Sequence, residues 1–181
     1  MTTANERFIP PDFTNHSPLT WYQAAASRPG FIQDASQRKA IECLDKLWTE
    51  LMMFKRKRNR FLGRSLRSPQ LPKGLYFYGG VGRGKSFLMD VFYGCLPYRR
   101  KRRVHFHAFM AEIHRRLREL KSEQDPLKSV AAEIARETRV LCFDEFHVSD
   151  IADAMILGRL LENLFNEGVV LVATSNYAPA E

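Results

Sequence analysis

Residues 74–92 read Gly-Leu-Tyr-Phe-Tyr-Gly-Gly-Val-Gly-Arg-Gly-Lys-Ser-Phe-Leu-Met-Asp-Val-Phe, and this stretch decides the fold. Its first part, residues 75–78, is a short apolar and aromatic run that is typical of a buried strand. Residues 79–86 follow and match the pattern G-x-x-x-x-G-K-[ST]. Residues 86–93 then favour a helix. Because strand, glycine-rich loop and helix are the context that a phosphate-binding loop (P-loop) requires, we predict a nucleotide site here.

The residue types in this loop suit phosphate chemistry. A loop that wraps phosphates turns its own N–H groups inward, which requires glycines that adopt positive φ without a Cβ in the way. Lys85 can reach the β- and γ-phosphates, the Ser86 hydroxyl can ligate Mg²⁺, and the helix N-terminus adds partial positive charge. The competing interpretation is a glycine-rich turn with a surface lysine. The residues expected to bind the nucleotide are Gly79, Gly80, Val81, Gly82, Arg83, Gly84, Lys85, Ser86 and Phe87.

The bulk composition is that of a globular protein. The chain has 181 residues, which suits one domain with its own core. No apolar run approaches the roughly 20 residues that span a bilayer, and residues 1–7 lack the features of a secretory signal. The three cysteines, Cys43, Cys95 and Cys142, are widely spaced without a C-x-x-C motif. We therefore expect reduced thiols in a cytoplasmic protein rather than a disulfide framework or a zinc site.

Two basic runs, residues 55–60 and 99–103, carry much of the net charge of +8. We favour the interpretation that both are solvated ends of helices or loops, where cations complement a helix dipole. Clustered Lys and Arg also attract the phosphates of nucleic acid. Neither run is accompanied by a base-stacking aromatic signature, so nucleic acid is not the expected partner.

The rest of the chain predicts an irregular N-terminal arm at residues 1–33 and a core at residues 34–181. Helices are expected at residues 19–26 (capped by Ser17 or Thr20), 34–54 (capped by Asp34 or Ser36), 110–120 and 125–137, and after the cap Asp150. The 34–54 helix has an apolar face of Ala40, Ile41, Leu44, Leu47, Trp48 and Leu51. The helix after Asp150 is expected to face the core with Ile151, Ala154, Met155, Leu161, Leu164 and Phe165.

Residues 103–110, Arg-Val-His-Phe-His-Ala-Phe-Met, alternate in a way that suggests a strand with His105 and His107 on one face. Such a pair could ligate a metal, but no third ligand has an identifiable spacing. We favour a structural or interface role for the two histidines.

Residues 139–145 read Arg-Val-Leu-Cys-Phe-Asp-Glu, four apolar residues followed by two carboxylates. The pattern predicts a buried parallel strand, and in P-loop enzymes the Asp at such a strand end holds Mg²⁺. The neighbouring Glu145 can polarise the water that attacks the γ-phosphate. Many strands end in acids, so the interpretation depends on the P-loop upstream. We expect Asp144 as a metal ligand beside Ser86, and Glu145 as the general base.

A fourth strand is expected at residues 169–176, released by Gly168 and ending in polar residues. Asn176 at its end could hydrogen-bond the attacking water or the γ-phosphate. The alternative is a polar strand terminus without a role. The expected catalytic residues are thus Lys85, Glu145 and Asn176.

With these residues in view, the chain resembles the ZapE-type cell-division ATPases of the Afg-like AAA+ family. The resemblance rests on residues 29–37, 74–86, 105–110, 141–157 and 172–176. Its most specific parts are Cys-Phe-Asp-Glu-Phe at 142–146 and Asp-Ile-Ala-Asp-Ala-Met at 150–155. It implies an α/β fold, the AAA+ αβα sandwich with a parallel sheet in the order 5-1-4-3-2. It also implies Lys85 and Ser86 as Walker A, Asp144 and Glu145 as Walker B, and Asn176 as sensor 1.

The same resemblance implies ATP and Mg²⁺ as cofactors and a homo-oligomeric AAA+ ring. It further implies a division partner such as FtsZ and a place peripheral to the inner membrane at the division site. The chain ends after the fourth strand, before the family positions of the fifth strand, arginine finger, sensor 2 and helical lid. We therefore expect a fragment that binds nucleotide with little hydrolysis. The competing interpretations are a helicase-loader-like AAA+ ATPase associated with nucleic acid and, less favoured, a P-loop small-molecule kinase.

Overall fold

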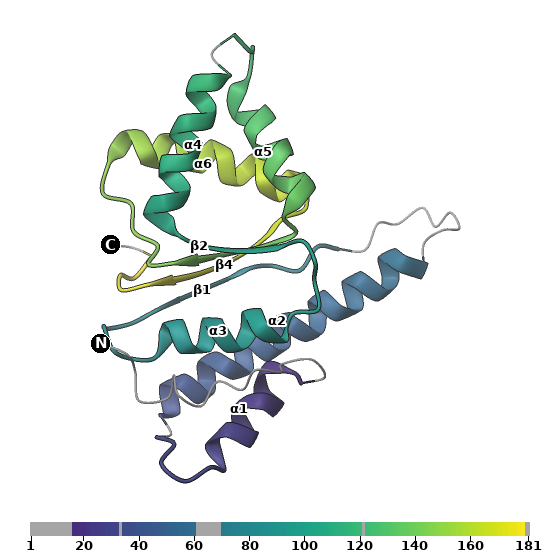
Figure 1. Cartoon of the computed structure of the whole chain (residues 1–181), viewed down its shortest axis with the longest axis vertical. Coiled ribbons are helices and arrows are strands. Elements are labelled where there is room, and N and C mark those ends of the chain that lie inside the picture. The colour runs from purple at the N-terminus through teal and green to yellow at the C-terminus, as the bar shows by residue number, and fades with distance from the viewer. Residues whose placement is uncertain (1–15, 33, 61–69, 121, 180–181) are drawn as a thin grey trace. The chain divides into compact units, whose positions relative to one another are not determined.

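The computed structural model describes residues 16–32, 34–60, 70–120 and 122–179, and for residues 58–60 the backbone alone. The chain forms two compact units, residues 1–97 (unit 1) and residues 98–181 (unit 2). Figure 1 shows the helices and strands of both. The expected division between an arm at residues 1–33 and a core at 34–181 stays a prediction.

Unit 1 contains helices α1 (Pro18–Ala26), α2 (Ala35–Arg60) and α3 (Lys85–Cys95) and strand β1 (Leu75–Tyr78). The Ser17 side chain accepts a hydrogen bond from the Thr20 N–H and caps α1, as one of the two expected caps. The Asp34 carboxylate accepts one from the Ser36 N–H at 2.7 Å in front of α2. The apolar stripe expected along α2 is confirmed, because Ile41, Leu44, Leu47 and Leu51 are buried. α1, α2 and α3 pack on one another.

An aromatic cluster joins the start of the chain to the helix that follows the P-loop. The Phe87 ring, fully buried in α3, lies 5.8 Å from the Trp21 ring and 6.2 Å from the Phe31 ring, centroid to centroid. The Tyr22 ring meets the Phe31 ring edge-on at 5.4 Å. Each such ring contributes roughly 1.5–3 kcal/mol through burial of apolar surface. This packing ties the Pro29-Gly30-Phe31 segment to the base of α3.

Unit 2 contains a parallel sheet of β2 (Lys101–His105), β3 (Val140–Asp144) and β4 (Val170–Ser175), in the order β4-β3-β2. Helices α4 (Phe106–Glu119), α5 (Pro126–Glu137) and α6 (Ile151–Asn166) lie on one side of these strands (Figure 1). Every residue of β3 is buried, as expected for the central strand of a parallel sheet. The α/β class with a parallel sheet is thus confirmed. β1 belongs to unit 1, so its expected place beside β4 stays a prediction.

The expected strand at residues 103–110 is wrong in its extent. β2 begins inside the second basic run, at Lys101, and ends at His105, and α4 starts at Phe106. Apolar side chains at 106, 109, 110 and 113 have helical spacing and are buried. The two-residue alternation therefore ended five residues earlier than we predicted. His105 ends the strand and His107 lies in the first turn of α4, yet their rings stack at 5.9 Å.

The expected core face of α6 is wrong in part. Its cap is confirmed, since the Asp150 carboxylate accepts from the Ala152 N–H at 2.7 Å. The buried side chains are Leu157, Leu160 and Leu164, whereas Ile151, Ala154, Met155 and Phe165 are exposed and Leu161 is half-buried. Apolar residues occur on all sides of this helix, so periodicity alone does not identify the buried side. α6 packs against α5, and its buried side is the one that carries Leu157.

Smaller differences concern β1 and the basic runs. β1 is half-buried rather than buried and its Tyr78 is exposed, because two of its four residues are tyrosines, whose polar tips tolerate a wet boundary. α2 continues beyond the expected end at Phe54 and includes the first basic run, where the Lys55 ammonium donates to the Pro97 carbonyl at 2.6 Å. The interpretation of the second run as solvated is wrong for Arg102 and Arg103, which form ion pairs with carboxylates of unit 2.

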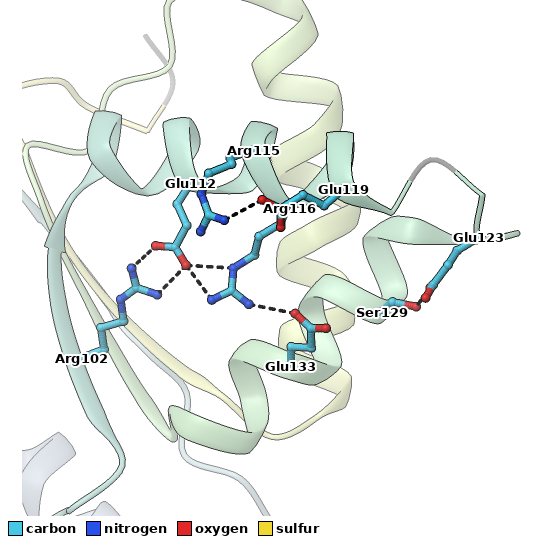
Figure 2. Close-up of polar contacts among 8 residues, drawn as sticks. All are labelled: Arg102, Glu112, Arg115, Arg116, Glu119, Glu123, Ser129 and Glu133. Carbon is cyan, nitrogen blue, oxygen red and sulfur yellow. Dashed lines mark hydrogen bonds and ion pairs between the residues drawn. The ribbon is translucent and has the colours of Figure 1, made fainter.

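A network of ion pairs joins β2, α4 and α5 in unit 2 (Figure 2). The Glu112 carboxylate accepts hydrogen bonds from the guanidinium groups of Arg102 and Arg116, and Arg116 also donates to Glu133 at 2.9 Å. The hydrogen bond from Arg102 is the main reason that the pKa of Glu112 lies below its ordinary value. Every oxygen of Glu112 has a partner. This network holds two helices to the edge strand of the sheet.

The three cysteines form no disulfide with one another, and Cys95 and Cys142 are buried whereas Cys43 is exposed. The expectation of reduced thiols stays a prediction. None of the helices, within the residues that the structure describes, is both long and apolar enough to cross a membrane.

Candidate functional site

The P-loop of unit 1 links β1 to α3, and its backbone takes the conformations that its glycines allow. Gly84 has φ 74° and is the N-cap residue of α3, and Gly82 has φ 79°. A residue with a Cβ is strained in this left-handed region. The Lys85 ammonium donates to the carbonyls of Gly79 at 2.6 Å and Gly80 at 2.9 Å. The lysine therefore lies against the first residues of the loop that the sequence predicted.

Two residues brace the loop, Asp34 just before α2 and Gln37 within that helix. The Gln37 side-chain N–H donates to the Arg83 carbonyl at 3.2 Å, and the Arg83 guanidinium lies 3.9 Å from the Asp34 carboxylate. A Cβ added at Gly84 would lie 2.6 Å from the Gln37 amide nitrogen, so the side chain sits close against the loop. Neither Asp34 nor Gln37 was among the expected site residues, although both belong to the segment that carries the family resemblance.

The remaining expected nucleotide-binding residues differ in exposure. Gly80, Val81, Gly82, Arg83 and Ser86 are exposed. Phe87 is fully buried in the aromatic cluster of unit 1 and can contribute only its backbone N–H to a ligand. Its side chain instead anchors the first turn of α3.

Asp144, the last residue of β3 in unit 2, has the most unusual environment of the expected site residues. Its side chain is 8% exposed, and its Oδ2 accepts a hydrogen bond from the Arg103 Nε at 2.6 Å. Its Oδ1 is buried without a hydrogen-bond partner among the described residues. A buried carboxylate oxygen without a partner is costly unless a ligand completes it. The geometry therefore fits a cation at this oxygen.

The Cys142 thiol lies on the same strand, two residues before Asp144, and its pKa is affected by the same charges. Burial raises its pKa to about 12, while the charge of Arg103 acts to lower that pKa and the charge of Asp144 acts to raise it. Cys142 is thus an inert core thiol, not a nucleophile.

Glu145 adopts a strained backbone. Its φ is 56°, the only positive φ of a non-glycine residue in the described part of the chain. The Glu145 N–H donates to the Thr174 hydroxyl at 3.2 Å, and the Phe146 N–H donates to the Thr174 carbonyl at 2.7 Å. These bonds from the end of β4 hold the turn in a conformation that costs on the order of 1–2 kcal/mol for a residue with a Cβ. Such strain is concentrated at functional sites.

The Glu145 side chain is 71% exposed, and its carboxylate lies 3.9 Å from the His105 Nδ1. Asn176 follows β4 directly and is exposed. The Ser175 hydroxyl, one residue earlier, donates to the Phe146 carbonyl at 2.6 Å and accepts from the Tyr177 N–H at 3.1 Å. Thr174 and Ser175 therefore shape the turn that presents Glu145. The sequence reasoning missed them, and their only signal was their polarity at the end of an apolar strand.

The structure thus brings Asp144 and Glu145 to the end of β3, beside the end of β4 that precedes Asn176. The P-loop belongs to unit 1, so its meeting with these three residues stays a prediction. Within the described ranges no three His, Cys, Asp or Glu side chains are grouped as a metal site would require.

Comparison with known proteins identifies relatives along most of the chain. A model of the AFG1-like ATPase family matches residues 16–181. The cell division protein ZapE of Escherichia coli (strain K12) is 43% identical over 176 residues, which cover 91% of this chain and 47% of ZapE. Lactation elevated protein 1 homolog B of Danio rerio is 53% identical over 124 residues, covering 62% of this chain and 25% of that protein. The chain therefore spans less than half of the length of these relatives.

A crystal structure of DnaI superposes on this chain with a TM-score of 0.53 at 21% sequence identity. The superposition covers 82% of this chain and 70% of DnaI. At this level of identity the likeness concerns the fold alone, and it supports the P-loop α/β class predicted from residues 74–92.

Proposed function

The chain belongs to the AFG1-like ATPase family, and from this premise we propose that it binds and hydrolyses ATP with Mg²⁺ as part of a cell-division protein. The observation that carries the proposal is Asp144, a buried carboxylate with one oxygen left without a partner in the described structure. A core carboxylate of this kind fits a cation ligand better than a structural ion pair.

The residues that would bind the nucleotide are those of the P-loop. The backbone N–H groups of residues 80–86 would bind phosphate oxygens, helped by the N-terminal dipole of α3. Lys85, whose ammonium already lies at the loop, would exchange its two carbonyl partners for phosphate oxygens. Val81 and Phe87 would contribute through their backbone.

The metal would be held by the Ser86 hydroxyl and the Asp144 carboxylate. When bound, Mg²⁺ neutralises phosphate charge and polarises the γ-phosphate. Glu145 is exposed at a strained turn, so its carboxylate is free to accept a proton from water as the general base. Asn176 would orient that water through its side-chain amide.

The first experiment is a titration of the folded chain with ATP and Mg²⁺ beside Lys85→Ala, with circular dichroism to verify both folds. We expect saturable binding in the unchanged chain and a loss of at least about tenfold in affinity in the variant, because a charge-assisted contact to phosphate is removed. Equal binding by both proteins would contradict the assignment of the P-loop as the nucleotide site.

The second experiment tests turnover. In a protein that hydrolyses ATP, Glu145→Gln is expected to retain ATP binding. The rate of hydrolysis should fall by on the order of 10²-fold or more, which is the usual contribution of a general base. Unchanged turnover of Glu145→Gln would remove Glu145 from that role and leave the binding proposal intact.

The cellular part of the proposal derives from the relative named as a cell division protein. We propose FtsZ or another division protein as the partner, a homo-oligomeric ring, and a cytoplasmic location peripheral to the inner membrane at the division site. Co-sedimentation with FtsZ filaments, with and without ATP, tests this part. Absence of the chain from the pellet at filament concentrations well above micromolar would contradict the partner.

Nucleic acid is the second candidate partner, and the structure of unit 2 weakens it. Arg102 and Arg103, two of the five residues of the second basic run, form ion pairs with Glu112 and Asp144. Their charge is not available for phosphate contacts. A salt series of DNA binding would distinguish the two partners, because each phosphate contact steepens the loss of affinity with salt.

A further inference from the structure

We propose that Arg103 is a positioning residue for the metal-binding carboxylate: it fixes Asp144 through Oδ2 so that Oδ1 alone is presented to Mg²⁺. The inference rests on the proposed function, since it concerns the same metal. It adds a residue from a different strand, within a basic run that the sequence suggested was solvated.

Arg103 and Asp144 lie on the same face of the sheet. In the parallel register, Arg103 lies opposite Cys142, and His105 lies opposite Asp144. Side chains alternate along a strand, so 103 and 105 share a face, as do 142 and 144. Arg103 therefore lies on the face that carries Asp144, one pair earlier along the strands. Its side chain needs to reach only diagonally to meet the carboxylate.

The Arg103 guanidinium is in direct contact with the Asp144 carboxylate. The Arg103 Nε donates to the Asp144 Oδ2 at 2.6 Å, and the two side chains are 22% and 8% exposed. A buried carboxylate that lost its cation would face a large desolvation penalty. The guanidinium therefore balances the carboxylate charge, and its planar donor limits the directions in which the carboxylate can turn.

The pairing with Arg103 uses only one of the two oxygens of the Asp144 carboxylate. Two-pronged pairing, in which one guanidinium takes both oxygens of a carboxylate, is common for arginine. Arg103 instead leaves Asp144 Oδ1 without a partner in the described part of the chain. One oxygen is held, and the other is buried without a partner. Groups that hydrogen-bond a metal ligand from behind set its orientation, and their removal typically lowers metal affinity by about 10–100-fold.

The adjacent residue supplies a matched control. Arg102 is also in β2, but its side chain lies on the opposite face and pairs with the Glu112 carboxylate (Figure 2). Its guanidinium also lies 5.7 Å from the Phe109 ring centre. Replacing Arg102 removes the same charge from the same strand and breaks an ion pair whose side chains are 30% and 18% exposed, without touching Asp144.

The test is the Mg²⁺ concentration that gives half-maximal ATP binding, measured for the unchanged chain, Arg103→Gln, Arg102→Gln and Arg103→Lys. We expect the half-saturating Mg²⁺ concentration to rise about tenfold in Arg103→Gln and less than twofold in Arg102→Gln. Arg103→Lys should recover most of the loss, because an ammonium still pairs with Oδ2. The thermal shift produced by ATP and Mg²⁺ together gives a second readout, expected to shrink in Arg103→Gln alone.

Two results would overturn the inference while the proposed function stands. One is equal Mg²⁺ dependence of Arg103→Gln and Arg102→Gln. The other is a lower half-saturating concentration in Arg103→Gln, which would mean that Arg103 opposes the cation. If Arg103→Gln does not fold, Arg103→Lys against Arg102→Lys decides, with a threefold rise expected in the former only. ATP binding by the unchanged chain that does not respond to Mg²⁺ would overturn the metal site itself, and this inference with it.

Discussion

Glu112 and Asp144 are both paired with arginines of β2, but the two carboxylates differ in how completely they are satisfied. Glu112 receives hydrogen bonds from Arg102 and Arg116 on both of its oxygens, in a network that continues to Glu133 (Figure 2). Asp144 is more deeply buried, yet has one partner and one open oxygen. A carboxylate whose oxygens all have hydrogen-bond partners is typical of a structural network. A buried carboxylate oxygen without a partner at the end of a strand instead indicates a place for a ligand.

The largest effect that would break this comparison is expected from Asp144→Asn. An amide of the same shape still accepts from Arg103 but lacks the charge that holds Mg²⁺. We expect the half-saturating Mg²⁺ concentration for ATP binding to rise by at least about tenfold. Glu112→Gln should leave it within about twofold. Equal responses of the two variants would mean that the open oxygen has no functional meaning.

The next largest effect is on stability. Glu112→Ala leaves the guanidinium groups of Arg102 and Arg116 without their shared carboxylate at a partly buried position. We expect the free energy of unfolding to fall by about 2 kcal/mol, as for a partly buried charge that loses its partner. Urea denaturation followed by circular dichroism measures it. A loss below about 0.5 kcal/mol would indicate that the network contributes no more than a surface pair.

The pH dependence of stability sharpens the same comparison. The pKa of Glu112 is lowered in the folded protein from its ordinary value of 4.5, chiefly by the hydrogen bond from Arg102. A lowered pKa means that the stabilisation is present above the unfolded value and is lost as pH falls through the folded value. The stability difference between the unchanged chain and Glu112→Gln should therefore be largest near neutral pH and shrink below about pH 4.5. A difference that is constant from pH 7 to pH 3 would contradict this.

The smallest effect is expected at the outer end of the network. Glu133 pairs with Arg116 at 2.9 Å, but its side chain is 47% exposed, so solvent screens the pair. Glu133→Gln should lower the free energy of unfolding by about 0.5 kcal/mol or less. A loss as large as that of Glu112→Ala would show that the three carboxylate contacts act as one cooperative unit.

Much of the local structure follows from the sequence. The β1–loop–α3 unit, the fully buried β3 and the caps Ser17 and Asp150 all lie where their residue types predict them. The errors occurred where a local pattern had two solutions. Residues 103–110 satisfied both a strand and a helix, and the helix began at Phe106. α6 carries apolar residues on every side, and only contact with α5 decided which side is buried.

The P-loop with its flanking elements and the acids that end β3 were therefore predictable from the chain alone. These features depend on short-range chemistry: glycine freedom at positive φ, a cation beside a loop, and an apolar run that ends in carboxylates. In contrast, the pairing of Arg103 with Asp144, 41 residues away, and of Arg102 with Glu112 follows from the folded sheet. The register of parallel strands and the alternation of side chains assign two adjacent arginines to opposite faces of one sheet. No local pattern contains that register, because it arises only when β2 and β3 pair.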